Sequence, residues 1–266
     1  ITMEKYLDRV QNDKIEIRLI KNKEELFAAQ RLRYKIFFEE CGAKASLEVE
    51  KEKRDFDEFD DFCDHLIAID KNAGPNPDDY IIGTYRLMRK DGAKKCGKWY
   101  SQTEFDIEKF ADYDGEVLEL GRSCVSANYR TKLVMQMLWN GLAAYMFDYD
   151  IKLMFGCGSF HGTDLSEYKQ ALSYLYYNYV ATGKLDVTAK GENKRDMQLL
   201  PKEEVNSIEA LREIPTMIKG YLRAGAKVGN SVWIDWNFNC FDVCIIFEMK
   251  NLKANYLKHY ENEIKK

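Results

Sequence analysis

Hydrophobic and polar residues follow two regular patterns along the chain, which together predict an alternating series of strands and helices. Short apolar or alternating stretches predict strands at residues 14–20, 65–70, 80–88, 116–125 and 152–157. Apolar residues three and four positions apart predict helices at residues 23–40, 131–148, 164–180 and 215–224. The helix over 131–148 is expected to bury one face, made of Leu133, Met137, Leu138, Leu142, Tyr145 and Met146. Residues 231–249 predict a turn and a final strand.

Other stretches lack this periodicity. Residues 43–64 form a dense run of charges, which is typical of a loop or a poorly packed segment, and residues 91–114 are ambiguous. Residues 182–207 predict a loop, and residues 156–164 (GCGSFHGTD) predict a turn from strand to helix. Early antiparallel strands followed by strand–helix–strand crossovers favour an α/β fold, with a central mixed sheet and helices on both faces.

Composition limits the class of protein. The chain has 266 residues, of which 45% are hydrophobic and 32% charged, and this suits one globular unit or at most two. The formal net charge of -4 does not favour a nucleic-acid binder. Seven scattered cysteines without a C-x-x-C motif indicate reduced thiols in a cytoplasmic protein. No apolar run approaches the roughly 20 residues of a membrane span, and the first residues lack the apolar segment of a signal peptide.

Charged residues inside two apolar strands are the first candidates for chemistry. Arg86 lies in TYRLM, and Glu119 and Arg122 lie in VLELGRSCV. A charge among apolar residues costs free energy unless it is paired or hydrogen-bonded. One interpretation is a structural ion pair between Glu119 and Arg86 or Arg122, and the other is a catalytic site.

Motifs along nearly the whole chain support the catalytic interpretation. They are RLRYKIF, DEFDDFCDHLIAI, IIGTYRLM, ELGRSCVSANYR, LWNGLAAYM, LMFGCGSFHGTD and PTMIKGYLRAGAKV. In this order, across residues 14–248, the chain resembles the acyl-carrier-protein-dependent ornithine N-acyltransferases of the GNAT-like superfamily. It is similar, with fewer matches, to the acyl-homoserine-lactone synthases, whose pattern is met by Arg33 and Phe37, Asp57 and Asp60, Arg86, and Glu119 and Arg122.

The resemblance implies a GNAT-like N-acyltransferase domain at residues 14–250, with an N-terminal extension at 1–13 and a polar tail at 251–266. The implied reaction moves a long-chain, 3-hydroxylated acyl group from acyl-carrier protein to the α-amine of ornithine and forms lyso-ornithine lipid. No cofactor would be bound permanently, since the donor is acyl-phosphopantetheine on the carrier protein. The implied partners are the carrier protein and an amino acid. The expected location is the cytoplasm, with peripheral contact at the inner membrane face.

The chemistry of amide formation assigns roles to the strand residues. An α-amine is largely protonated at neutral pH, so Glu119 is predicted to act as the general base, directly or through a water. Arg122 and Arg86 would hold either Glu119 or a substrate carboxylate by fork-shaped hydrogen bonding. A backbone N–H near Cys124 or Val125 would stabilise the thioester oxygen in the tetrahedral intermediate. Cys124 is the alternative nucleophile, but no histidine lies close in sequence, so direct transfer is preferred.

The segment after this strand predicts the type of donor. CoA-using members carry a Gly-rich turn there, whereas SANYRTKLVMQMLWNG has no glycine before Gly141. Arg130 and Lys132 at the helix start are predicted to bind the phosphate of phosphopantetheine or the surface of the acidic carrier protein. The alternative is an ordinary solvated helix start.

The acceptor site is expected to combine opposite charges. Arg33 and Phe37 are its predicted residues on the first helix, while Asp57, Asp60 and Asp64 would neutralise the side-chain ammonium of ornithine. The alternative is a solvated acidic loop. His161 is predicted to line a turn or pocket, and no metal site is expected.

Other functions remain open from sequence alone. The chain could acylate a different amino acid, make acyl-homoserine lactone, or be a catalytically silent module that binds a carrier protein or lipid. The presence of Glu119, Arg86 and Arg122 at the motif positions favours an active enzyme.

Overall fold

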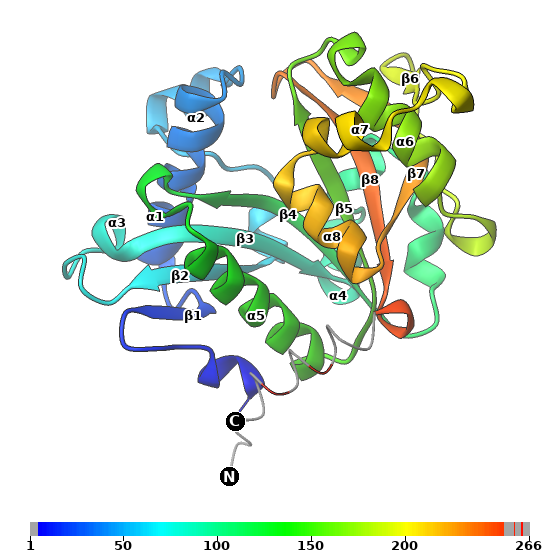
Figure 1. Ribbon diagram of the computed structural model, residues 1–266. Helices are drawn as coiled ribbons and strands as arrows, with labels where there is room; N and C mark the ends of the chain where they lie inside the picture. Colours follow the sequence, from blue (N-terminus) through cyan, green and yellow to red (C-terminus); the bar gives the residue numbers. More distant parts are fainter. Residues whose placement is uncertain (1–4, 253–257, 259–261, 263–266) are drawn as a thin grey trace. The chain divides into compact units, whose positions relative to one another are not determined.

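The computed structural model describes residues 5–252, Lys258 and Asn262 (Figure 1). The chain divides into two compact units, one built mainly from residues 1–96 and 120–151 and the other from residues 97–119 and 152–253. Most of the predicted polar tail lies outside the described residues.

Eight strands are present among the described residues. Their bounds are β1 Ile15–Leu19, β2 Asp64–Asp70, β3 Ile81–Arg89, β4 Glu116–Val125, β5 Ile151–His161, β6 Lys194–Asp196, β7 Lys227–Asp235 and β8 Cys240–Glu248. The hydrogen-bonded order is β1-β2-β3-β4 in the first unit and β5-β8-β7-β6 in the second. The strand pairs β1/β2, β2/β3, β5/β8, β7/β8 and β6/β7 are antiparallel, and a single bridge from Val180 to Val228 is parallel. The predicted α/β fold with a mixed sheet is confirmed.

The described residues confirm the four predicted helices and add four shorter ones that were not predicted. Their bounds are α1 Lys23–Tyr34, α2 Leu47–Glu52, α3 Pro77–Tyr80, α4 Lys90–Cys96, α5 Lys132–Asp148, α6 Lys169–Tyr179, α7 Ser207–Glu213 and α8 Thr216–Ala224. Helix α1 continues as a π-helical segment, Lys35–Glu40. The predicted buried face of α5 is correct except for Leu133, which is 49% exposed in the first helical turn.

In the first unit, α1 and α5 cover opposite faces of the sheet. Ala28 and Ala29 of α1 pack with Ile67 of β2. Gly141 of α5 lies instead against Ile17 and Leu66, and successive strand residues such as Leu66 and Ile67 point to opposite faces. A Cβ at Gly141 would lie 2.3 Å from Ile17 Cγ2, so only glycine lets α5 approach the sheet this closely.

The second unit corrects two predictions. Residues 156–161 belong to β5, because the strand continues to His161 and turns only at Gly162. Residues 231–249 hold most of a hairpin of β7 and β8, not a turn and one strand. The predicted loop at 182–207 contains the short strand β6, and α7 begins at its last residue.

The charge run at residues 43–64 is not poorly packed. It contains α2, and Asp55, Phe59 and Asp60 are only 3–4% exposed. Asp55 and Asp60 are buried because they meet arginines from three other segments. No described helix has the length and apolar character that a membrane span requires.

Candidate active site

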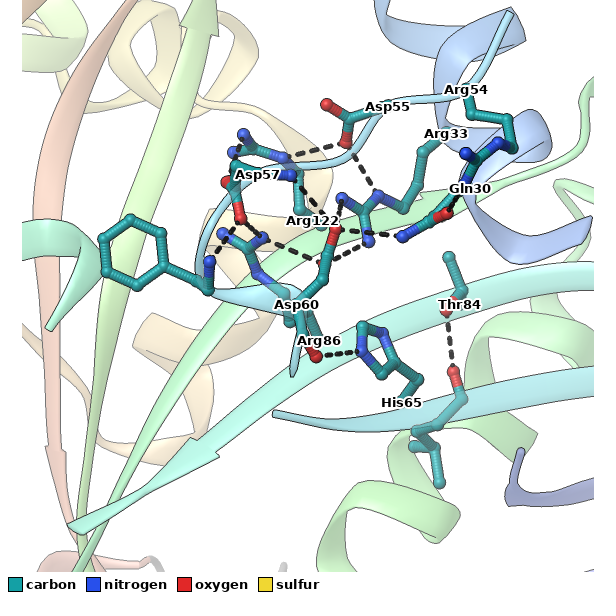
Figure 2. A network of polar contacts seen from close by, with 12 residues as sticks. Gln30, Arg33, Arg54, Asp55, Asp57, Asp60, His65, Thr84, Arg86 and Arg122 are labelled. Carbon is teal, nitrogen blue, oxygen red and sulfur yellow. Dashed lines mark hydrogen bonds and ion pairs between the residues drawn. The ribbon is translucent and has the colours of Figure 1, made fainter. Parts of the chain in front are cut away.

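A buried cluster of three arginines and three aspartates forms in the first unit (Figure 2). Its members, called here the arginine–aspartate cluster, are Arg33, Asp55, Asp57, Asp60, Arg86 and Arg122. The arginines come from α1, β3 and β4, and the aspartates from the segment between α2 and β2. One helix and two strands therefore hold the arginines in place, and the segment between α2 and β2 places the aspartates next to them.

Arg33 lies at the base of this cluster and is 1% exposed. Its Nε donates to Asp55 Oδ2 at 2.7 Å, and its Nη1 donates to Asp60 Oδ1 at 2.9 Å. Its Nη2 donates to Asp60 Oδ2 at 3.2 Å. With all three groups engaged, Arg33 holds the loop in place and is not reachable by a substrate.

Arg86 and Arg122 continue the network. Arg86 Nη1 donates to Asp57 Oδ1 at 2.6 Å and to Asp60 Oδ1 at 3.1 Å. Arg122 Nε donates to Asp55 Oδ2 at 3.0 Å, and its Nη2 donates to Asp57 Oδ2 at 3.2 Å. Within the cluster, Asp57 at 23% side-chain exposure and Arg122 at 10% are the most accessible members.

The cluster keeps its aspartates ionised. Burial raises the pKa of Asp55 and Asp60, but the neighbouring guanidinium groups outweigh burial and hold both pKa values below the usual range. Burial likewise opposes the charge of Arg33, and Asp55 and Asp60 reverse that effect and raise its pKa. The site is thus a set of fixed charges of both signs.

Beneath the cluster, His65 Nε2 lies 2.9 Å from the carbonyl oxygen of Asp60. A carbonyl oxygen can only accept, so Nε2 is the donor. Burial lowers the pKa of His65, so the ring is neutral at pH 7. Neither His65 nor Asp55 was among the predicted site residues. His65 is one histidine at the start of an apolar strand, and Asp55 is one aspartate within a run of charges. Nothing in the sequence therefore distinguishes either residue as part of a site.

Two predicted acceptor residues lie outside the cluster. Asp64 accepts a hydrogen bond of 2.6 Å from Tyr145 Oη and lies 3.8 Å from Arg89 Nε. It lines a small polar hollow of about 220 Å³ with Lys95 and other residues. Phe37 is half-buried in the π-helical segment that follows Arg33.

Strand β4 carries an irregular backbone at the site. Arg122 has a φ of 49°, in the left-handed region, although it is not a glycine. Such a conformation costs on the order of 1–3 kcal/mol and often marks functional positions. The neighbouring Gly121 is the kind of residue that accommodates a distorted strand.

Glu119 is held separately, within the second unit. It is 4% exposed, its Oε1 accepts from Tyr100 N at 3.0 Å, and its Oε2 accepts from Ser101 N at 2.7 Å. Both donors belong to a 3-10 turn, Tyr100–Thr103. Backbone groups of this turn therefore orient the carboxylate.

On the donor side, burial raises the pKa of the Cys124 thiol to about 12. A thiol that stays protonated at neutral pH is a poor nucleophile, which agrees with direct transfer. Arg130 Nε donates to the Val125 carbonyl at 3.0 Å, and its Nη2 lies 2.6 Å from Glu40 Oε2. Lys132 is exposed at the first position of α5, after the Thr131 cap.

The chain is similar to known proteins in sequence and in fold. The acetyltransferase (GNAT) domain family matches residues 32–140. An L-ornithine N(alpha)-acyltransferase of Rhizobium meliloti (strain 1021) is 41% identical over 256 residues, covering 96% of this chain and 86% of the relative. One from Rhodobacter capsulatus is 36% identical over 249 residues, covering 94% of this chain and 95% of the relative.

The chain belongs to the L-ornithine N(alpha)-acyltransferase family. A solved CoA-dependent acyl-homoserine lactone synthase, BjaI, with SAM and isopentyl-CoA, aligns with a TM-score of 0.50 at 12% identity. That alignment covers 95% of this chain and 89% of the synthase, and at this identity it shows a shared fold.

Family membership confirms the predicted GNAT-like fold and the assignment as an acyltransferase. Of the predicted residues, the structure brings Arg33, Asp57, Asp60, Arg86 and Arg122 into one cluster. The alternative interpretation of the acidic run as a solvated loop is wrong for Asp60, which is buried.

Proposed function

We propose that the protein transfers a long-chain acyl group from acyl-phosphopantetheine on acyl-carrier protein to the α-amine of ornithine. The observation that carries this proposal is 36–41% identity over 86–95% of the length of relatives named for that activity. The product would be lyso-ornithine lipid, with a 3-hydroxylated acyl chain.

The step forms one bond and breaks one. The neutral α-amine attacks the thioester carbon, a C–N bond forms, and the C–S bond then breaks to release the pantetheine thiolate. Before the attack, the ammonium loses one proton to Glu119, which passes it to solvent. After the C–N bond forms, the nitrogen loses a second proton, and the departing thiolate takes up a proton to become the thiol. Glu119 suits this role because two backbone amides orient its carboxylate.

The acceptor would be bound by the accessible side of the arginine–aspartate cluster. Arg122 would bind the α-carboxylate by exchanging its 3.2 Å contact with Asp57 for one with the substrate, and Asp57 would then pair with the side-chain ammonium. In this proposal Arg33, Asp60 and Arg86 form the frame, with Phe37 and Asp64 at the edge of the acceptor site. A preorganised pair of opposite charges would favour an amino acid with a second ammonium.

On the donor side, Arg130 and Lys132 would meet the phosphate of phosphopantetheine or the acidic surface of the carrier protein. A backbone N–H of the distorted end of β4, near Cys124 or Val125, would stabilise the developing oxyanion. Donor and acceptor are cytoplasmic molecules, so the reaction would take place there. A long-chain product would leave into the inner membrane face through peripheral contact.

The test incubates purified protein with 3-hydroxyacyl-carrier protein and, separately, ornithine, lysine, norvaline or S-adenosylmethionine. Mass spectrometry of the products should show acyl-ornithine as the preferred product. Preference for another amino acid, acyl-homoserine lactone, or no product with any acceptor would contradict the proposal. Equal efficiency with acyl-CoA would contradict the carrier-protein donor alone.

A further inference from the structure

A second group of polar side chains lies at the turn that holds Glu119, within the second unit. Its members are Ser101, Glu104, Cys157 and Asp242. Glu104 is 1% exposed and Asp242 is 4% exposed, although both carry carboxyl groups. Burial of this kind requires a partner for each group.

Direct contacts join these side chains. Cys157 Sγ lies 3.2 Å from Glu104 Oε2 and 3.5 Å from Ser101 Oγ. Glu104 and Asp242 are hydrogen-bonded to each other, and their oxygens lie within 4.8 Å of Cys157 Sγ. Asp242 also has a hydrogen bond with Ser159.

Two buried carboxyl groups this close cannot both be ionised. Burial raises the pKa of Glu104 well above its usual value, and the charge of Asp242 raises it further. Burial also raises the pKa of Asp242, while hydrogen bonds from Ser159 and Glu104 oppose that rise. In the described part of the chain neither carboxyl forms an ion pair with lysine or arginine. One proton is therefore shared, with Glu104 as the donor.

This pair is tied to Glu119 through a short stretch of backbone. Glu104 directly follows the turn Tyr100–Thr103, and Glu104 N donates to Ser101 O at 3.0 Å. Ser101 in turn presents its own N–H to Glu119 at 2.7 Å. Displacement of Glu104 would move both amides that orient the catalytic carboxylate.

We infer that Glu104 is a positioning residue: protonated and hydrogen-bonded to Asp242, it fixes the turn whose two amides aim the Glu119 carboxylate. The inference rests on the proposed role of Glu119 as base. The other titratable groups near Glu104 are the half-buried Cys157 on β5 and the buried Asp235 on β7, together with Cys240 and Cys244 on β8, which are also buried.

The experiment compares Glu104→Ala, Glu104→Gln and Glu119→Gln with the parental protein. A matched control is Glu248→Gln, since Glu248 is also a buried glutamate of the second unit and accepts a 2.7 Å hydrogen bond from Tyr113. For each folded variant, kcat, KM for ornithine and the pH profile of kcat/KM are measured.

Glu104→Ala should lower kcat roughly 10-fold or more, because small displacements of catalytic groups are costly, with little change in KM. The acid limb of kcat/KM should move to higher pH, since a carboxylate that loses amide donors binds its proton more tightly. Glu104→Gln should stay within about twofold of the parental rate, because its amide still donates to Asp242. Glu248→Gln should leave kcat and the limb unchanged.

An independent measurement does not depend on the alanine variant folding. Infrared difference spectra at pH 7 should show the carbonyl band of a protonated carboxyl in the parental protein and not in Glu104→Gln. Absence of that band would overturn the inference. So would one equivalent of metal held by the parental protein and lost in Glu104→Gln, because the carboxyls would then be ionised ligands.

The two proposals fail in different ways. If Glu119→Gln keeps the parental rate, the role of Glu119 as base is wrong. If Glu119→Gln is slow but folded Glu104→Ala keeps the parental kcat and acid limb, only the positioning role is wrong. If the role is correct, Glu104→Ala added to Glu119→Gln should lower kcat little further.

Discussion

The two units bury acidic side chains to the same depth and treat them in opposite ways. In the arginine–aspartate cluster, Asp55 and Asp60 keep their charge because three guanidinium groups surround them, and their pKa values fall. In the second unit, Glu104 and Asp242 share a proton, and their pKa values rise. Burial alone therefore does not decide ionisation, and the charges and hydrogen-bond donors around each carboxyl group do.

The difference matches what each region is proposed to do. A charged acceptor needs fixed charges of both signs, and the arginine–aspartate cluster supplies them. The catalytic base needs an oriented carboxylate and little competing charge around it. Protonation of Glu104 leaves the Glu104–Asp242 pair with one negative charge instead of two, and the additional buried anion would oppose the ionisation of Glu119.

The largest expected effect is on stability and comes from Arg33, the most buried cation of the arginine–aspartate cluster. Arg33→Leu should lower the free energy of unfolding by about 3–5 kcal/mol, because Asp55 and Asp60 would keep buried charges without their main partner. Urea unfolding measures this loss. The control is Arg31→Leu on the same helix, whose pair with Asp78 is 40% and 56% exposed and should contribute at most about 1 kcal/mol. Equal losses would show that the cluster does not depend on Arg33.

The pH dependence of stability should separate the two regions. The stabilisation by Asp60 is fully present above its unfolded pKa of about 4 and is lost as the pH falls toward the folded value. The stabilisation by Glu104 is fully present below about 4 and is lost as the pH rises through its raised pKa. For one proton, the free energy of unfolding should change by at most about 1.4 kcal/mol per pH unit in either case.

Unfolding titrations of the parental protein, Asp60→Asn and Glu104→Gln measure both slopes. The difference between the parental protein and Asp60→Asn should shrink in acid. The difference between the parental protein and Glu104→Gln should shrink toward higher pH. If both differences in the free energy of unfolding changed with pH in the same direction, the proposed contrast between the two regions would be wrong.

A moderate effect is expected at the accessible carboxylate of the cluster. Asp57→Asn should raise KM for ornithine by roughly 10-fold and barely change KM for norvaline, because only ornithine has a second ammonium. Asp64→Asn is the comparison, and it should have a smaller effect because Asp64 already pairs with Tyr145. An unchanged preference in both variants would place recognition of the ammonium elsewhere.

The smallest effect is expected on the solvated donor side. Reversing the charges of Arg130 and Lys132 to Glu should weaken use of acyl-carrier protein several-fold and flatten its salt dependence. Lys184→Glu with Lys202→Glu makes the same charge change at exposed positions of the second unit. Similar losses in both double variants would indicate a general effect of net charge.

The sequence predicted most strands and helices because apolar periodicity is a local property. It failed for β5, where Gly156 and Gly158 resemble a turn. A Cβ at Gly158 would lie 2.9 Å from Ile245 Cγ1 and 3.2 Å from Ile218 Cδ1, so this glycine reflects close packing by distant residues.

The site was partly predictable for the same reason. Arg86, Glu119 and Arg122 stand out as charges within apolar strands. The burial of Asp55 and Asp60 depends on arginines from α1, β3 and β4, which no local pattern reveals. The amides that hold Glu119 come from residues 100 and 101, in a stretch without periodicity.

The most direct test of the account is single-turnover acyl transfer by Glu119→Gln with saturating ornithine and acyl-carrier protein. The glutamine keeps the size of the side chain and removes the base, so the account predicts a folded protein with a rate roughly 10²-fold or more below the parental rate. A folded variant that transfers the acyl group at the parental rate would contradict it.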